Sequence, residues 1–169
     1  EELNIYTWAE YVPQDVIDGF EEKTGIKVNY TNFEANEEML AKLETSKGGD
    51  YDIIIASDYI IKIAADEGLV KEIDKEKVPN YQNIDPVFQN FFYDPDNKLT
   101  VPYGPGIPLI VYNPEAVSTE ITGYESLWDP SLKDSIALMD SERVVMGMVL
   151  KTMGESFNTE DQAVIKQAG

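Results

Sequence analysis

The spacing of apolar residues alternates between strand-like and helix-like over the first 70 residues of the chain. Residues 3–8 and 27–33 are rich in β-forming side chains, and 52–56 contain the unbroken β-branched run typical of a strand covered on both faces. A segment with apolar residues on one helical face follows each strand. These faces consist of Val16, Ile17 and Phe20, then of Met39, Leu40 and Leu43, and then of Ile60, Ile61, Ile63 and Ala64.

Strand–helix alternation of this kind predicts an α/β fold with a doubly wound parallel sheet and right-handed crossovers. The first strand is expected between the other two. The helix ends carry suitable residues as well. Pro13 fits the first turn of the first helix, Asn36 is expected to cap the second, and Ser57 with Asp58 the third. Glycines stand where the helices should end, at Gly25, Gly48, Gly49 and Gly68.

Beyond Val70 the pattern loosens into turns, and fewer elements are predicted. Strands are expected at 109–112 and 135–139. A helix at 144–153 would be capped by Asp140 or Ser141, and a capping box of Thr159 and Gln162 would begin a last short helix. These elements do not close a layer. The sequence therefore predicts a second lobe that is begun and not finished.

Composition excludes several functional classes. The chain has 13 Lys and Arg against 32 Asp and Glu, a net charge of -19 that argues against binding nucleic acid or anionic lipid. Cationic partners are permitted, although a solvated acidic surface explains the charge equally well. The absence of Cys and His removes disulfides, thiolate sites and the commonest general base. No cofactor or metal is predicted.

One stretch has the look of a metal site and is better explained as a turn. Asp94, Asp96 and Asn97 resemble the start of a calcium loop, but the twelfth position is Pro105, where the loop needs a bidentate Glu. A turn built on Pro and Asn is therefore predicted.

Sequence signals for cellular location are few. No apolar run approaches the 18 residues of a membrane span, and no signal peptide is recognisable at the start. These features leave open a cytosolic protein or the mature or trimmed form of an exported one.

The most suggestive chemistry lies at the carboxyl end of the first strand, where Trp8, Glu10 and Tyr11 follow one another closely. In an open α/β sheet this end is where ligands bind. Aromatic faces presented with a carboxylate suit an organic cation. The alternative is that Trp8 and Tyr11 simply close the hydrophobic core, and their positions alone leave the two interpretations about even.

Six motifs then carry a family resemblance, in register over nearly the whole chain. Each is weak alone, and together they are specific. The chain resembles the spermidine/putrescine-binding proteins of polyamine ABC transporters. The motifs are YTWAEYVP at 6–13, TGIKV at 24–28, NEEMLAKL at 36–43, YDIIIASDY at 51–59, VPY at 101–103 and LWDP at 127–130.

The resemblance implies a type II periplasmic-binding-protein fold, whose two lobes close on a polyamine, and a protein that is not an enzyme. It implies a first lobe at 1–108, a hinge crossing at 109–114 and an incomplete second lobe at 115–169. Full family members are about twice as long, so a carboxyl-terminal half would be absent from this chain. The implied location is the periplasm or the extracellular face of the membrane, and the implied partner is an ABC permease.

The family's ligand positions transfer where the residues match. The resemblance implies ligand-binding roles for Trp8, Glu10 and Tyr11 after the first strand, and for Ser57 and Tyr59 after the third. Ser141 is the candidate in the second lobe, at a position where the family often has Asp.

Two positions depart from the family's pattern. Ala9 replaces a common hydroxyl residue, and Val144 stands where the family usually has an amine-binding Glu. These substitutions leave the length and identity of the polyamine open. The competing classes are a soluble enzyme, for which no nucleophile–base constellation stands out, and a sensor or scaffold lobe that borrows the fold.

Overall fold

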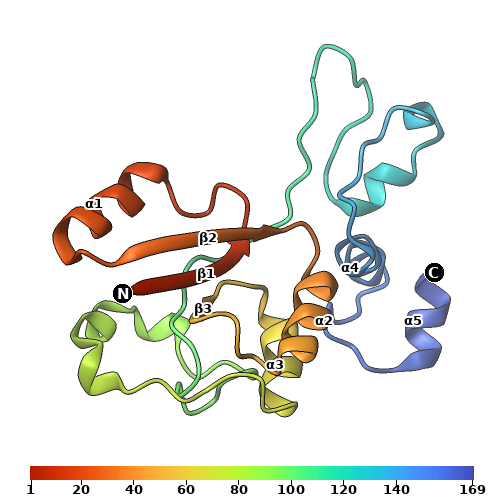
Figure 1. Cartoon of the computed structure of the whole chain (residues 1–169). Helices are drawn as coiled ribbons and strands as arrows, with labels where there is room; N and C mark the ends of the chain where they lie inside the picture. The colour runs from red at the N-terminus through yellow and green to blue at the C-terminus, as the bar shows by residue number, and fades with distance from the viewer. The chain divides into compact units, whose positions relative to one another are not determined.

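The computed structural model describes all 169 residues, which form two compact units, 1–104 and 105–169. Each unit has its own hydrogen bonds and packed side chains, and each is described by itself below. Figure 1 colours the chain from red at its start to blue at its end.

The first unit is built on a three-stranded parallel sheet in the order β2-β1-β3. The strands are β1 (Glu2–Trp8), β2 (Lys27–Phe33) and β3 (Ile53–Ile54). Strand β1 pairs with β2 along its whole length and with β3 over two residues, Ile5 opposite Ile53 and Tyr6 opposite Ile54. The predicted strand order and direction are confirmed.

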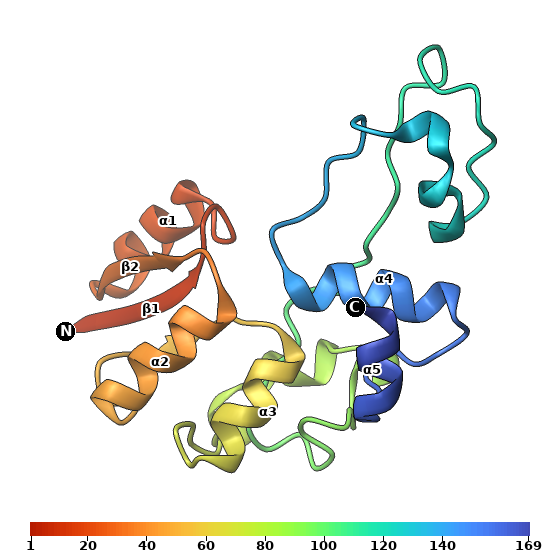
Figure 2. The same ribbon diagram turned by 90° about the vertical axis from the view of Figure 1, so that its right-hand side faces the viewer.

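Three helices cover this sheet: α1 (Gln14–Thr24), α2 (Asn36–Ser46) and α3 (Asp58–Asp66). Figures 1 and 2 show α1 on one face and α2 with α3 on the other, which is the doubly wound arrangement. Helix α1 ends at Gly25, whose φ of 71° is the left-handed conformation that glycine adopts without a steric cost. The predicted helices and their alternation with strands are thus confirmed.

The core lies between the sheet and the α2–α3 layer. Tyr6 is fully buried there, with its ring stacked on Tyr51 at 4.4 Å and edge-on to Phe33 at 5.1 Å between centroids. Burial raises the pKa of the Tyr6 hydroxyl, because the charged form is poorly solvated inside the protein. The buried cluster is completed by Met39, Leu43 and Ile60.

Three local predictions in this unit are wrong. Strand β3 has two residues where five were expected, and Ile53, expected in a strand covered on both faces, is 44 % exposed. Ile63, expected on the inner face of α3, is exposed as well. Ala35 occupies the N-cap position of α2, and Asn36 is its first helical residue with its side chain turned toward α3.

Residues 67–104 contain short 3₁₀ turns, η1 (Lys75–Lys77), η2 (Pro79–Asn83) and η3 (Pro86–Phe88), and the turn built on Asp94. The Asp94 side chain is 4 % exposed and accepts hydrogen bonds from the backbone N–H groups of Lys98, Leu99 and Thr100 at 2.8–2.9 Å, and from the Thr100 hydroxyl at 3.0 Å. The carboxylate is therefore occupied by N–H donors, and the predicted turn is confirmed.

This turn supports a stability prediction. Burial alone would raise the pKa of Asp94, but the hydrogen bonds from Leu99, Lys98 and Thr100 outweigh it and hold that pKa below its usual value. Asp94→Asn places an amide group among N–H donors, and we expect the free energy of unfolding at pH 7 to fall by about 1 kcal/mol. Urea unfolding followed by circular dichroism measures the change.

The pH dependence gives this prediction its control. A carboxyl whose pKa is lowered on folding stabilises the protein above the ordinary Asp range, and that stabilisation is lost as the pH falls through the folded pKa. The gap between Asp94→Asn and wild type should therefore close below about pH 4. Asp96→Asn, in the same turn but exposed and paired only with Lys98, should unfold like wild type at every pH. A gap that persists into acid would contradict this account.

The second unit is helical. It contains η4 (Tyr124–Trp128), η5 (Pro130–Leu132), α4 (Glu142–Thr152) and α5 (Gln162–Ala168). Of the two residues expected to cap α4, Asp140 and Ser141, it is Ser141 that does so. Asp161, and not the predicted Thr159–Gln162 box, caps α5 by accepting from the N–H groups of Ala163 and Val164. None of the helices in the protein combines the length and apolar content required to cross a bilayer.

The strands predicted at 109–112 and 135–139 do not form. Both segments are mainly apolar, as strands often are, yet most of their side chains are exposed, with Val111 92 % exposed and Leu138 half exposed. A strand exists only where a neighbouring strand accepts and donates its backbone hydrogen bonds, and the second unit contains no sheet. The composition was interpreted correctly, but the pairing that a strand requires is missing.

Candidate functional site

The parallel strand order brings several of the sequence-predicted ligand residues to one edge of the first unit. Strand β1 ends at Trp8 opposite Phe33 of β2, and Ser57 lies three residues after the end of β3, at the start of α3. Because all three strands run in the same direction, the loop 9–12 and the start of α3 leave the sheet at its carboxyl edge. This is the edge at which open α/β sheets bind their ligands.

The aromatic side chains at this edge divide between core and surface. The Trp8 ring packs on Phe33 at 4.5 Å between centroids and is half-buried against the core cluster. Tyr11 lies 6.4 Å from Trp8 between centroids and is 45 % exposed. Core closure therefore does not explain Tyr11, and it explains only one side of Trp8.

Two further tyrosines, which sequence reasoning did not assign to the site, brace loop 9–12. The Tyr30 hydroxyl donates to the carbonyl of Trp8 at 2.9 Å and accepts from the N–H of Val12 at 3.3 Å, so it bridges the two ends of the loop. The Tyr103 ring stacks on Tyr11 at 5.9 Å between centroids, and its hydroxyl donates to the Tyr11 carbonyl. The presence of Tyr103 in one of the six sequence motifs was the available signal.

Glu10 sits within this braced loop in an unusual conformation. Its φ of 60° is the left-handed region, which costs a non-glycine residue about 1–2 kcal/mol. Its carboxylate is exposed and makes no hydrogen bond or ion pair within the chain. The same loop that carries Tyr11 therefore presents an uncompensated negative charge to solvent.

A second group of polar residues lies at the start of α3. Ser57 occupies the N-cap position, but its hydroxyl makes no capping hydrogen bond. Asn36 donates from Nδ2 to the Ser57 hydroxyl at 3.0 Å and to the Tyr59 hydroxyl at 2.9 Å, and its Oδ1 accepts from the Ser57 N–H at 3.3 Å. Tyr59 in turn donates to Oε1 of Glu37 at 2.9 Å. Ser57 thus stands at the predicted N-cap position, but its side chain bonds to Asn36 and does not cap the helix.

The combined arrangement has a definite chemical character. It offers aromatic faces, hydroxyl oxygens and two exposed carboxylates, those of Glu10 and Glu37, with no basic side chain hydrogen-bonded to either. No group of three or more acidic side chains is placed to hold a metal ion. Such a surface can bury methylene groups and meet positive charge, which is what an organic ammonium ligand requires.

Ser141 belongs to the other unit. Its hydroxyl oxygen accepts from the N–H of Val144 at 3.4 Å as the cap of α4. That bond leaves the hydroxyl proton available to a ligand. The participation of Ser141 in a shared site stays a prediction.

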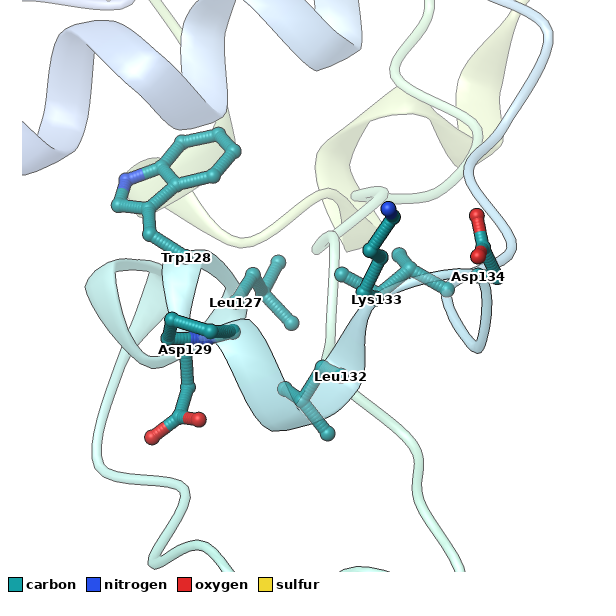
Figure 3. Close-up of a pocket in the computed structure, with 8 residues that line it drawn as sticks. Leu127, Trp128, Asp129, Leu132, Lys133 and Asp134 are labelled. Carbon is teal, nitrogen blue, oxygen red and sulfur yellow. The ribbon is translucent and has the colours of Figure 1, made fainter.

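The second unit also contains an open hollow of about 570 Å³, shown in Figure 3, that sequence reasoning did not predict. Trp128 and Asp129 stand on one side of it and Lys133 on the other. Asp129 accepts from the N–H of Ser131 at 2.8 Å as the cap of η5, and its bonds with Ser131 lower its pKa. This carboxylate therefore holds a turn, and the hollow offers a ligand mainly apolar surface.

Known bacterial binding proteins resemble this chain over nearly all of its length. The family described as bacterial extracellular solute-binding protein matches residues 15–168. The spermidine/putrescine-binding periplasmic protein of Salmonella typhimurium is 41 % identical over 167 residues, which cover 98 % of this chain and 48 % of that protein.

Solved structures agree with these sequence relatives. A structure from Listeria monocytogenes, named as a spermidine/putrescine ABC transporter, superposes with a TM-score of 0.88 at 38 % identity and covers 99 % of this chain and 52 % of its own. The spermidine/putrescine ABC transporter substrate-binding protein of Streptococcus pneumoniae gives a TM-score of 0.77 at 36 % identity, with the same two coverages. The chain thus spans about half the length of the relatives that it matches.

Proposed function

The chain belongs to the bacterial extracellular solute-binding protein family, and from this we propose that it forms the amino-terminal half of a polyamine receptor. The complete receptor would capture spermidine or putrescine between two lobes and deliver it to an ABC permease in the membrane. It would act in the periplasm or at the extracellular face of the cell. The resemblance found in the sequence and the type II periplasmic-binding fold are confirmed by the relatives and the solved structures.

One observation carries the proposal: the rings of Trp8 and Tyr11 lie 6.4 Å apart between centroids at the carboxyl edge of the sheet, in a loop that also carries the exposed Glu10. A polyamine is a chain of methylenes punctuated by ammonium groups. A cation–π contact contributes about 0.5–2 kcal/mol, and a charge-assisted hydrogen bond about 1.5–3 kcal/mol. Several such contacts must combine to offset the desolvation of the ammonium groups, and ring faces beside carboxylates provide them.

The other classes have less support. The relatives are named as binding proteins and not as enzymes, and the net charge of -19 disfavours nucleic acid as a partner. A different cationic solute is the second candidate, because the resemblance implies that Val144 replaces an acidic residue and Ala9 a hydroxyl residue of the family. A sensor lobe of the same fold would share the site and would lack only the permease.

Thermal unfolding of the complete gene product, the full-length protein of the gene that encodes this chain, tests the proposal. A ligand at 100 times its Kd stabilises the folded state by about 2.7 kcal/mol, so spermidine or putrescine should raise the Tm clearly. Sugars and amino acids at equal concentration and ionic strength are the controls. A shift with a control solute and none with either polyamine would overturn the proposal.

A further inference from the structure

We propose that Glu37 is a ligand-binding residue that provides a counter-charge for one ammonium group, and that Asn36 is the positioning residue that aligns Ser57 and Tyr59 beside it. Neither residue was predicted from the sequence to take part in ligand binding. The inference rests on the proposed function, since it concerns the same carboxyl edge of the sheet and names the groups that set affinity at its β3–α3 end.

The position of Asn36 is the first step. Its side chain is 6 % exposed, at the first residue of α2, and it faces the start of α3. Both protons of its amide are used, one by the Ser57 hydroxyl and one by the Tyr59 hydroxyl, and its oxygen accepts from the Ser57 N–H. Because Asn36 donates to the Ser57 oxygen, the Ser57 proton must point elsewhere. Asn36 thereby makes both hydroxyl oxygens accept from its amide, so that each hydroxyl donates its own proton in another direction.

The direction of this network leads to Glu37. Tyr59 accepts from Asn36 and donates to Oε1 of Glu37, so a chain of hydrogen bonds runs from a buried amide to an exposed carboxylate. The Tyr59 bond holds the carboxylate of Glu37 toward α3. An ammonium group that approaches the Ser57 and Tyr59 hydroxyls therefore meets a negative charge held in place by the protein.

The neighbouring Glu38 offers a matched control for Glu37. Glu37 and Glu38 both lie in the first turn of α2, where a negative charge interacts favourably with the helix dipole. Glu38 makes no hydrogen bond to Tyr59, since only Glu37 reaches that hydroxyl. Glu37→Gln and Glu38→Gln remove the same charge from the same helix end, and they differ in the contact that matters here.

The experiment is calorimetric titration of the complete gene product with spermidine at fixed salt. Glu37→Gln should weaken binding about fivefold, and Glu38→Gln should stay within twofold of wild type. In a Tyr59→Phe background the loss from Glu37→Gln should shrink, because the bond that orients the carboxylate is gone. Equal losses in the two glutamine variants, or a full fivefold loss in the Tyr59→Phe background, would overturn the role of Glu37.

Asn36→Leu tests the positioning role, with Asn29→Leu as its control. Asn29 also makes two side-chain hydrogen bonds through its amide, to Glu2 and Asn4, but in the body of β2. We expect Asn36→Leu to weaken binding about fivefold and Asn29→Leu to leave it unchanged. Equal affinities in the two variants would overturn this role. If Asn36→Leu does not fold, Asn36→Ser takes its place. If neither spermidine nor putrescine binds the wild-type protein, the proposed function fails and this inference fails with it.

Discussion

Replacing Trp8 by alanine in the complete gene product should weaken spermidine binding at least tenfold, which corresponds to about 1.4 kcal/mol. The indole packs on Phe33 through one face, and its remaining surface lies beside Tyr11 at the carboxyl edge of the sheet. The loss combines a cation–π contact with the apolar surface that the methylenes of a polyamine would cover. Titration calorimetry at fixed salt measures it, because salt alone changes the affinity of a cation for an acidic protein.

Two variants keep this result interpretable. Trp128, the only other tryptophan, is 58 % exposed in the second unit and is not a predicted ligand residue, so Trp128→Ala should bind spermidine like wild type. Trp8→Phe retains an aromatic ring against Phe33 and should lose less affinity than Trp8→Ala. Unchanged affinity of a folded Trp8→Ala protein would assign Trp8 to core packing alone.

The fold of the first unit was predictable because its signals are local. Alternating residues in 3–8 and 27–33, one-face spacing in the helices and Gly25 at a helix end depend on neighbours a few residues away. General topological rules then placed β1 in the middle of the sheet. The exposure of Ile53 and Ile63 was not predictable, because it depends on which parts of the chain cover them.

The segments 109–112 and 135–139 show the same limit more strongly. Their composition favours strands, but a strand is defined by its partner, and no strand in the second unit is available to pair with them. The pattern of side chains indicates that a segment can form a strand if a neighbouring strand pairs with it. It does not indicate whether that partner strand is present.

The placement of the candidate residues could be predicted in part for a comparable reason, while their binding roles stay predictions. Trp8 ends β1, and Tyr11 and Ser57 lie three residues beyond the ends of β1 and β3, so the order of the elements alone brings Trp8 and Ser57 to one edge. Asn36, Tyr30 and Tyr103 act through contacts with residues 21, 22 and 92 positions away. Asn36 in particular has the sequence context of a helix cap, and only the packing of α2 beside α3 shows that its amide is directed toward Ser57.

The 169-residue chain by itself should bind spermidine or putrescine only at millimolar concentration, about a thousandfold more weakly than a receptor of micromolar affinity. The first unit presents rings and carboxylates on an exposed edge, where water screens the charges. Ser141, the residue predicted to bind ligand in the second unit, lies on a helical body without a sheet, and the strand-like segments of that unit are largely exposed. A ligand that is not enclosed keeps part of its hydration and loses the gain in electrostatic energy that a dry site provides.

Calorimetry of this chain and of the complete gene product, at equal salt and with the same ligand stocks, decides the question. The free energy of binding should weaken from about -8 kcal/mol for the complete gene product to about -4 kcal/mol for the 169-residue chain. Trp8→Ala in the short chain serves as the baseline, since residual binding at the sheet edge should decrease further in that variant. A one-to-one isotherm at low micromolar concentration for the short chain would mean that residues 1–169 contain the whole site.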